Sequence, residues 1–178
     1  KDRGDDIMKK IILAVFGLLG ISCATSYNAL ETADKFDVNK YLGKWYEVWR
    51  LPNSFEEGLE EITANYILRE DGKITVINEG RLIEDKSKIK QAKGVAWIPD
   101  INEPSKLKVT FFWPFSADYW VLYVDQDYQH ALVGGPSRKY LWILSRDRQA
   151  DPKVVEDMKE FAASLGFPVE NMISGLAD

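Results

Sequence analysis

Cysteine and histidine are nearly absent from this sequence, which has one of each among 178 residues. A single cysteine cannot form an intramolecular disulfide, and a structural zinc site needs several Cys or His ligands. The composition therefore disfavours a zinc centre and a Cys–His catalytic pair, and we expect no metal and no cofactor.

Excess positive charge is also lacking. The 23 Lys and Arg residues are scattered among 28 Asp and Glu residues, for a net charge of −5. Nucleic-acid-binding proteins usually present a basic face, so we expect no nucleic-acid partner. Aromatic residues make up 12% of the chain. This content suits strands and an apolar cavity, although an ordinary core explains it almost as well.

The hydrophobic run near the N-terminus, Ile11–Ile21, is short. Its eleven residues would cover about 16 Å as a helix, roughly half of a bilayer core, so a membrane-spanning helix is not predicted. The run follows Met8, Lys9 and Lys10, and residues 8–22 have the charged and apolar regions of a secretory signal. Residues 1–7 lie upstream of this signal.

Cys23 directly follows the run and resembles the acylated cysteine of a bacterial lipobox, although Gly20 stands where a leucine is usual. The resemblance implies cleavage before Cys23, addition of fatty-acyl chains such as palmitate, and a polar tether over residues 23–35. Ala24 beside the cysteine resembles lipoproteins sorted to the outer membrane. Two alternatives remain: cleavage after Ala24, which releases a soluble periplasmic protein, or a buried structural cysteine.

Eight short strand-like runs, each ended by a turn signal, follow between residues 43 and 146. Asp71-Gly72 is the strongest of these hairpin signals. This rhythm predicts an all-β, antiparallel domain, and spacing alone does not distinguish a sandwich from a barrel. The predicted strands are Gly43–Leu51, Ile62–Arg69, Lys73–Ile83, Ile89–Ile98, Leu107–Phe112, Tyr119–Val124, His130–Gly134 and Tyr140–Ser145.

A helical period follows the last strand. Asp151 is a good N-cap, Pro152 suits the first turn, and Gly166 ends the segment. Val154, Val155, Met158, Phe161, Ala162 and Leu165 form one apolar stripe. We expect this C-terminal helix to pack against the outside of the sheet.

Three ordered segments resemble the lipocalin family. Gly43-Lys44-Trp45 matches the Gly-x-Trp motif that opens its first strand, Asp125–Tyr128 lies where the family has a Thr-Asp-Tyr-type turn, and Arg146 follows the last strand. The chain is most similar to the bacterial outer-membrane lipocalins of the Blc type and to apolipoprotein D. The resemblance implies an eight-stranded up-and-down β-barrel over residues 36–178. In this family the tryptophan and the arginine seal the closed end, so Gly43, Trp45 and Arg146 are expected to be structural.

Strand alternation then predicts the interior positions. If Arg146 faces inward, so do Leu144 and Trp142, and Trp142 is the best candidate for ligand contact. The same count from Trp45 points Glu47 and Trp49 inward unless a bulge changes the phase. Small residues, such as Gly94 and Ala96, would leave space unfilled. The predicted ligand-binding residues are Trp142, Trp49, Ala64, Tyr66, Val76, Asn78, Ala96, Val109, Tyr119 and Val121.

The resemblance implies a fatty acid or a lysophospholipid as ligand, and a membrane-anchored protein of the bacterial outer membrane, on its periplasmic face. A second hypothesis is a structural envelope lipoprotein whose barrel binds nothing. An enzyme is disfavoured, because the one cysteine lies in the leader and His130 has no evident nucleophile partner. The segments Leu51–Leu59 and Phe112–Phe115 either line the barrel entrance or cover its rim.

Overall fold

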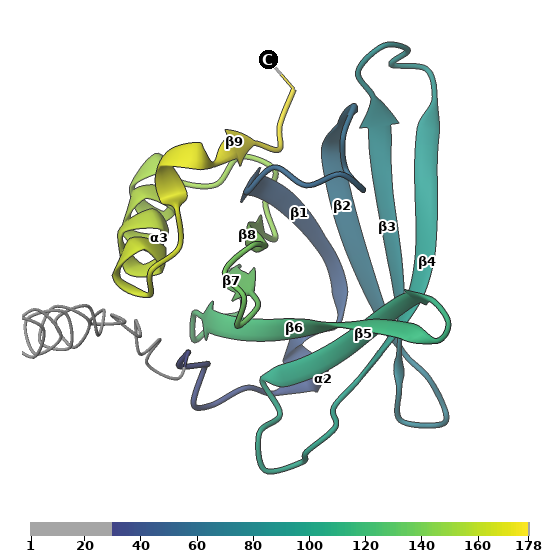
Figure 1. Cartoon of the computed structure of the whole chain (residues 1–178), viewed down its shortest axis with the longest axis vertical. Helices are drawn as coiled ribbons and strands as arrows, with labels where there is room; N and C mark the ends of the chain where they lie inside the picture. Colours follow the sequence, from purple (N-terminus) through teal and green to yellow (C-terminus); the bar gives the residue numbers. More distant parts are fainter. Residues whose placement is uncertain (1–29, 178) are drawn as a thin grey trace, which may run out of the picture.

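The computed structural model describes residues 30–177, and the predicted leader and Cys23 lie outside them. One antiparallel sheet with the strand order β2-β3-β4-β5-β6-β7-β8-β1-β9 curls until β1 also pairs with β2, which closes a barrel (Figure 1). Consecutive strands are neighbours throughout this barrel, so the topology is up-and-down. The predicted eight-stranded barrel with a C-terminal helix is confirmed.

The strands follow one another through short turns. Gly72, at φ +76°, occupies the left-handed position of the predicted Asp71-Gly72 turn, where a side chain would be strained. The barrel strands are β1 Gly43–Arg50, β2 Leu59–Leu68, β3 Ile74–Leu82, β4 Ile89–Trp97, β5 Lys106–Phe112, β6 Phe115–Val124, β7 His130–Gly134 and β8 Leu141–Ser145.

The strand β6 begins four residues before the predicted start. Ser116, Ala117 and Asp118 lack the apolar alternation that identifies a strand, and yet they belong to it because β5 supplies a partner. Asp118 lies opposite Lys108, and their side chains form an ion pair at 2.7 Å. Pairing with a neighbouring strand thus decides a boundary that local composition does not indicate.

The helix α3, Pro152–Ser164, lies outside the barrel (Figure 1). The Asp151 side chain caps it by accepting a hydrogen bond from the Lys153 amide. Val155, Met158 and Ala162 are buried against hydrophobic residues on the outer face of β6, β7 and β8, and these form a core separate from the barrel interior. Phe161, predicted on the same stripe, is 39% exposed and contacts the Tyr123 ring at its edge.

Three short elements complete the described chain. The helix α2, Val38–Tyr41, precedes β1 and lies at the closed end of the barrel (Figure 1). The 3-10 turn η1, Val169–Asn171, leads from α3 to β9, Ile173–Ser174, which pairs with the end of β1. These elements have too few residues to show a period, so the sequence does not predict them.

Part of the segment expected to be a tether is attached to the barrel. Leu30 is buried in the outer core, the Ala33 amide donates to the Val121 carbonyl at 2.9 Å, and the Ser105 hydroxyl donates to the Ala33 carbonyl. Residues 30–33 therefore pack against the barrel. Within residues 30–177, no helix is both long and apolar enough to cross a membrane.

Candidate ligand-binding cavity

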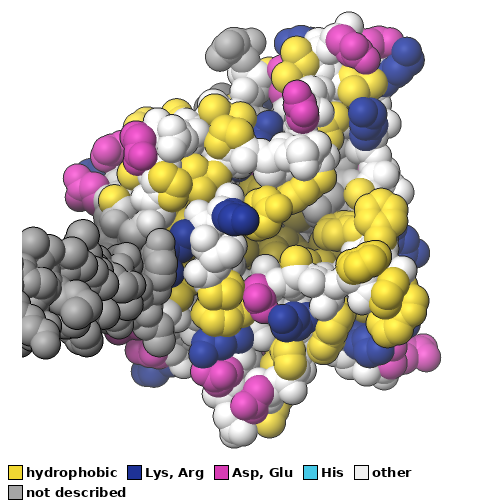
Figure 2. Space-filling view, viewed as in Figure 1, with side chains coloured by type: hydrophobic (Ala, Val, Ile, Leu, Met, Phe, Trp, Pro, Cys, Tyr) yellow, Lys and Arg dark blue, Asp and Glu magenta, His cyan; other side chains and the backbone are white. Residues whose placement is uncertain are grey.

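The barrel encloses a cavity of about 530 Å³. Its walls are mainly apolar, and Figure 2 shows hydrophobic side chains lining a hollow at the centre of the face viewed there. The cavity opens among the loops that follow β1 and β5 and precede β8, since Phe55, Phe112 and Tyr140 line it. This volume lies within the usual range for small-molecule sites, about 300–1,000 Å³.

Eight of the ten residues predicted to bind ligand line this cavity. They come from six strands, which supports the alternation argument for most of the barrel. The eight are Ala64, Tyr66, Val76, Asn78, Ala96, Val109, Tyr119 and Trp142. Their contact with a ligand remains a prediction.

Trp49 does not line the cavity, and its predicted inward orientation is wrong. The β1–β8 register shifts between Glu47 and Trp49, so one extra residue reverses the alternation after Glu47. The Trp49 ring instead lies on the outside, with the Lys159 ammonium of α3 3.2 Å from its centroid. Glu47 keeps the predicted orientation and does line the cavity.

Val121 also lies away from the cavity surface. Its side chain is fully buried in the inner core with Trp45 and Tyr128, so the inward direction was right. The residue is too close to the closed end, where packed side chains leave no space for a ligand. Val121 thus belongs to the barrel floor.

Trp45 and Arg146 seal this floor. The Trp45 ring is completely buried, its Nε1 donates to the Tyr41 carbonyl at 2.7 Å, and the Arg146 guanidinium carbon lies 3.9 Å from its centroid. Arg146 also donates to the Lys44 carbonyl at 2.7 Å and the Leu42 carbonyl at 2.8 Å. The arginine thereby ties the end of α2 to the start of β1, beneath the cavity.

The Asp125–Tyr128 turn adds to the same end. Asp125 accepts hydrogen bonds from the Gln129 and His130 amides, and its Oδ2 lies 2.8 Å from His130 Nδ1. The Tyr128 hydroxyl accepts from the Asp37 amide at 2.7 Å, which fixes the chain before α2. His130 therefore orders a turn at the floor and is not among the residues that line the cavity.

A buried charge cluster lies at the open end. Arg50 Nη1 donates to Glu47 Oε1 at 2.9 Å, and its Nε lies 3.5 Å from Glu56 Oε2. All three residues are at most 7% exposed. Glu56 Oε2 also accepts from Asn53 Nδ2 at 2.5 Å and from Trp142 Nε1 at 3.2 Å. The cluster ties the β1–β2 loop to β1 and β8.

The pKa of Glu47 is raised well above its usual value. Burial is the main cause, and the nearby Glu56 carboxylate adds to it, while the Arg50 guanidinium acts in the opposite direction. Two buried carboxylates share one guanidinium, so the cluster favours a proton on Glu47.

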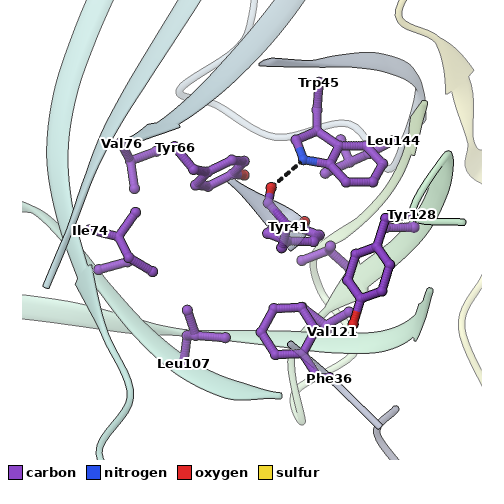
Figure 3. Packing of buried hydrophobic residues seen from close by; sticks show 13 residues of the cluster. Phe36, Tyr41, Trp45, Tyr66, Ile74, Val76, Leu107, Val121, Tyr128 and Leu144 are labelled. Atoms are coloured by element: carbon purple, nitrogen blue, oxygen red, sulfur yellow. Dashed lines mark hydrogen bonds between the residues drawn. The ribbon is translucent and has the colours of Figure 1, made fainter. Parts of the chain in front are cut away.

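Three tyrosine hydroxyls meet deeper in the cavity. Tyr41 Oη lies 2.8 Å and Tyr66 Oη lies 2.6 Å from Tyr119 Oη. Burial is the largest cause of a raised pKa in each, to about 12 for Tyr66. Figure 3 shows Tyr41 and Tyr66 beside Trp45, with Ile74, Val76 and Leu107 around the remaining space.

Exposed aromatic side chains surround the cavity opening. Phe112, Trp113 and Phe115 at the β5–β6 turn are 78–86% exposed, and Phe55 in the β1–β2 loop is 59% exposed. Phe55, Phe112 and Phe115 also line the cavity, so both predicted aromatic segments reach the entrance. Within residues 30–177, no cluster of three or more His, Cys, Asp or Glu side chains has the arrangement of a metal site.

Tyr41 and Glu56 are among the polar contributors to the cavity that sequence reasoning missed. Tyr41 ends the short helix α2, and Glu56 lies in the loop between β1 and β2. Neither position belongs to a strand, so alternation gives no orientation for it. The signal that was available for Tyr41 is its place two residues before the Gly-x-Trp motif.

Comparison with known proteins agrees with this architecture. A family model described as a lipocalin-like domain matches residues 36–176. The outer membrane lipoprotein Blc of Escherichia coli (strain K12) is 41% identical over 160 residues, covering 90% of each chain. Apolipoprotein D of Bos taurus is 41% identical over 147 residues, covering 78% of this chain and 76% of that protein.

Solved structures show the same fold at lower identity. Insecticyanin from the tobacco hornworm Manduca sexta superposes with a TM-score of 0.66 at 23% identity, over 85% of each chain. The cockroach allergen Per a 4 superposes with a TM-score of 0.64, also at 23% identity, over 83% of this chain and 92% of that one.

Proposed function

Since this chain belongs to the lipocalin family, we propose that its barrel binds one lipid-like amphiphile, a fatty acid or a lysophospholipid, for storage or transport. The observation that carries the proposal is the cavity of about 530 Å³, apolar along its walls, sealed at the floor and open at the other end. Lipocalins bind small hydrophobic ligands, and this cavity offers the space and the surface for one.

The wall chemistry favours an acyl chain. Each methylene group transferred from water to an apolar wall gains about 0.8 kcal/mol, so a long chain binds without a specific polar contact. Small side chains keep the space open: Ala64 and Ala96 line the cavity. A barrel used only as a spacer would gain stability from larger residues there, because filling a cavity adds apolar contact.

We infer binding and not catalysis. The titratable groups on the cavity wall are carboxylates and tyrosines, and His130 lies at the floor with Asp125. Among the lining residues of the described chain there is no Cys or His to pair with Ser116 as a nucleophile and base.

The ligand-binding proposal is tested by a matched pair of substitutions. Ala64→Phe places a ring inside the cavity, whereas Ala163→Phe places the same ring on the exposed face of α3. Titration with N-phenyl-1-naphthylamine, which fluoresces in apolar surroundings, should give saturable binding to the wild type and to Ala163→Phe. Ala64→Phe should weaken it about 10-fold or more, because the ring takes the place of part of the ligand.

Native mass spectrometry of the protein as purified identifies the ligand class. A co-purified fatty acid or lysophospholipid supports the proposal. A folded wild type that carries no lipid and does not bind the fluorophore would refute it and favour the spacer hypothesis.

We also propose that Cys23 is acylated and anchors the barrel to the outer membrane, on its periplasmic face. Relatives that cover 90% of this chain are named outer membrane lipoproteins, and the cysteine follows a leader-like run. Leu30, the first buried residue that the structure describes, is seven positions after Cys23, so the anchor lies at most about 24 Å from it along the chain.

Labelling of cells with alkynyl palmitate tests the anchor. The full chain should incorporate the label and sediment with outer membranes, and Cys23→Ser should lose both properties. Recovery of the wild type as an unlabelled soluble protein with an N-terminus after Ala24 would establish the alternative cleavage.

A further inference from the structure

The three-tyrosine cluster, Tyr41, Tyr66 and Tyr119, lies on the wall of the cavity and not in a filled core. Its members come from α2, β2 and β6, so three separate elements converge on one point. Tyr41 and Tyr66 are 2% and 5% exposed. A convergence of buried hydroxyls on an apolar cavity is costly unless their hydrogen-bonding capacity is used.

A proton count shows which part of this capacity is held least firmly. Each hydroxyl carries one proton, and Tyr119 Oη joins the other two oxygens through two hydrogen bonds. Those bonds use two of the three protons. The third proton lies between Tyr41 and Tyr66, whose hydroxyls interact more weakly with each other than with Tyr119, and the cavity is next to them.

The hydroxyls keep their protons. Burial raises the pKa of all three, to about 12 for Tyr66, so the cluster is neutral and able to donate at any physiological pH. An oxygen acceptor is therefore the complementary ligand group.

The open end has the opposite character. Glu47, Glu56 and Asp118 line the cavity there, and among its lining residues in the described chain there is no Lys or Arg. Arg50 is engaged by Glu47 and by the Leu59 carbonyl. A ligand carboxylate left at the opening would thus meet no Lys or Arg among the lining residues, whereas one at the cluster would face hydroxyl donors.

We propose that the three-tyrosine cluster binds the carboxyl group of a fatty acid that enters the barrel polar end first. This inference rests on the proposed function and adds the ligand class and its orientation. The acyl chain then runs along the apolar wall towards the aromatic side chains at the opening.

The first test compares dodecanoic acid with 1-dodecene as competitors of N-phenyl-1-naphthylamine. Tyr119→Phe removes the hydroxyl that joins the other two. It should lower the affinity for dodecanoic acid by about 2- to 12-fold, the range for one neutral hydrogen bond. The affinity of Tyr119→Phe for dodecene and for the fluorophore should equal that of the wild type.

Tyr128→Phe is the matched control. It removes a buried hydroxyl that bonds Asp37 and lies outside the cavity, so acid binding should equal that of the wild type. Tyr66→Phe replaces Tyr119→Phe if the latter fails to fold. An unchanged preference for the acid in a folded cavity variant would overturn the inference.

The second test reads the orientation directly. With [1-13C]dodecanoic acid, the carboxyl resonance of the bound ligand should not titrate between about pH 4 and pH 8 if the group is at the cluster, because it is shielded from water. Titration near the ordinary pKa of a carboxylic acid would place the carboxyl at the opening and refute the inference. If neither the acid nor the fluorophore binds the wild type, the proposed function itself fails.

Discussion

Replacing Arg146 by alanine should destabilise the barrel without changing its ligand affinity. The arginine side chain lies below the cavity, between the end of α2, the start of β1 and the Asp125–Tyr128 turn. Alanine removes the cation over the Trp45 ring and leaves several main-chain carbonyls without their donor.

The magnitude follows from these contacts. A cation over an indole contributes about 0.5–2 kcal/mol, and one hydrogen bond from a charged donor about 1.5–3 kcal/mol. Arg146 is partly exposed, so water replaces some of the lost bonds. We therefore expect Arg146→Ala to lower the free energy of unfolding by about 2–4 kcal/mol and the Tm by about 5–15 °C.

Urea unfolding followed by tryptophan fluorescence measures the loss. Arg146→Lys separates the two contributions, because lysine keeps the charge over Trp45 and lacks the planar fork that reaches several carbonyls. Arg146→Lys should lose about half as much free energy of unfolding as Arg146→Ala. If the free energy of unfolding of Arg146→Ala lies within about 0.5 kcal/mol of the wild-type value, Arg146 does not stabilise the barrel floor as argued.

Two further predictions concern the open end and the corrected strand phase. Burial raises the pKa of Glu47 in the folded state, so the free energy of unfolding of the wild type should fall as the pH rises from the unfolded pKa, about 4.3, through the folded value. Urea titrations at several pH values should show that Glu47→Gln lacks this part of the pH dependence. Parallel pH profiles of the two proteins would contradict the raised pKa. Trp142→Ala should weaken the binding of N-phenyl-1-naphthylamine about 5-fold or more, because Trp142 lines the cavity. Trp49→Ala should reduce the stability of the barrel and leave the affinity for the fluorophore unchanged, because Trp49 lies on the outside. Equal losses of affinity in the two variants would contradict the faces assigned to these residues.

Alternation predicts the interior well where one face of a strand is polar. In β3, Val76 and Asn78 face the cavity and alternate with Thr75 and Ile77, so parity places Val76 and Asn78 correctly. In β1 both faces are covered, one by the cavity and floor and the other by the α3 side of the barrel. A strand with two buried faces has apolar or aromatic residues on each, so its sequence does not reveal the bulge that turns Trp49 outward.

Residues outside strands escape prediction for a different reason. Glu56 reaches the cavity because Trp142, 86 positions away, holds the β1–β2 loop, and this contact exists only in the folded barrel. The short helix α2 is likewise held by Arg146, which is more than 100 positions away. Sequence patterns report local periodicity, and neither contact is local.

The charge cluster links the entrance to the cavity wall. The Phe55 ring lies 5.5 Å from the Tyr140 ring, which stacks on Trp142 at 5.9 Å, and Trp142 donates to Glu56 in the loop that carries Phe55. A ligand that contacts Trp142 therefore contacts a side chain that is hydrogen-bonded to the β1–β2 loop, and this loop lies at the entrance through which the ligand passes. Glu56 also lies against Arg50, which donates a hydrogen bond to Glu47. One set of contacts therefore couples three quantities: the protonation of Glu47, the position of the β1–β2 loop and the occupancy of the upper cavity.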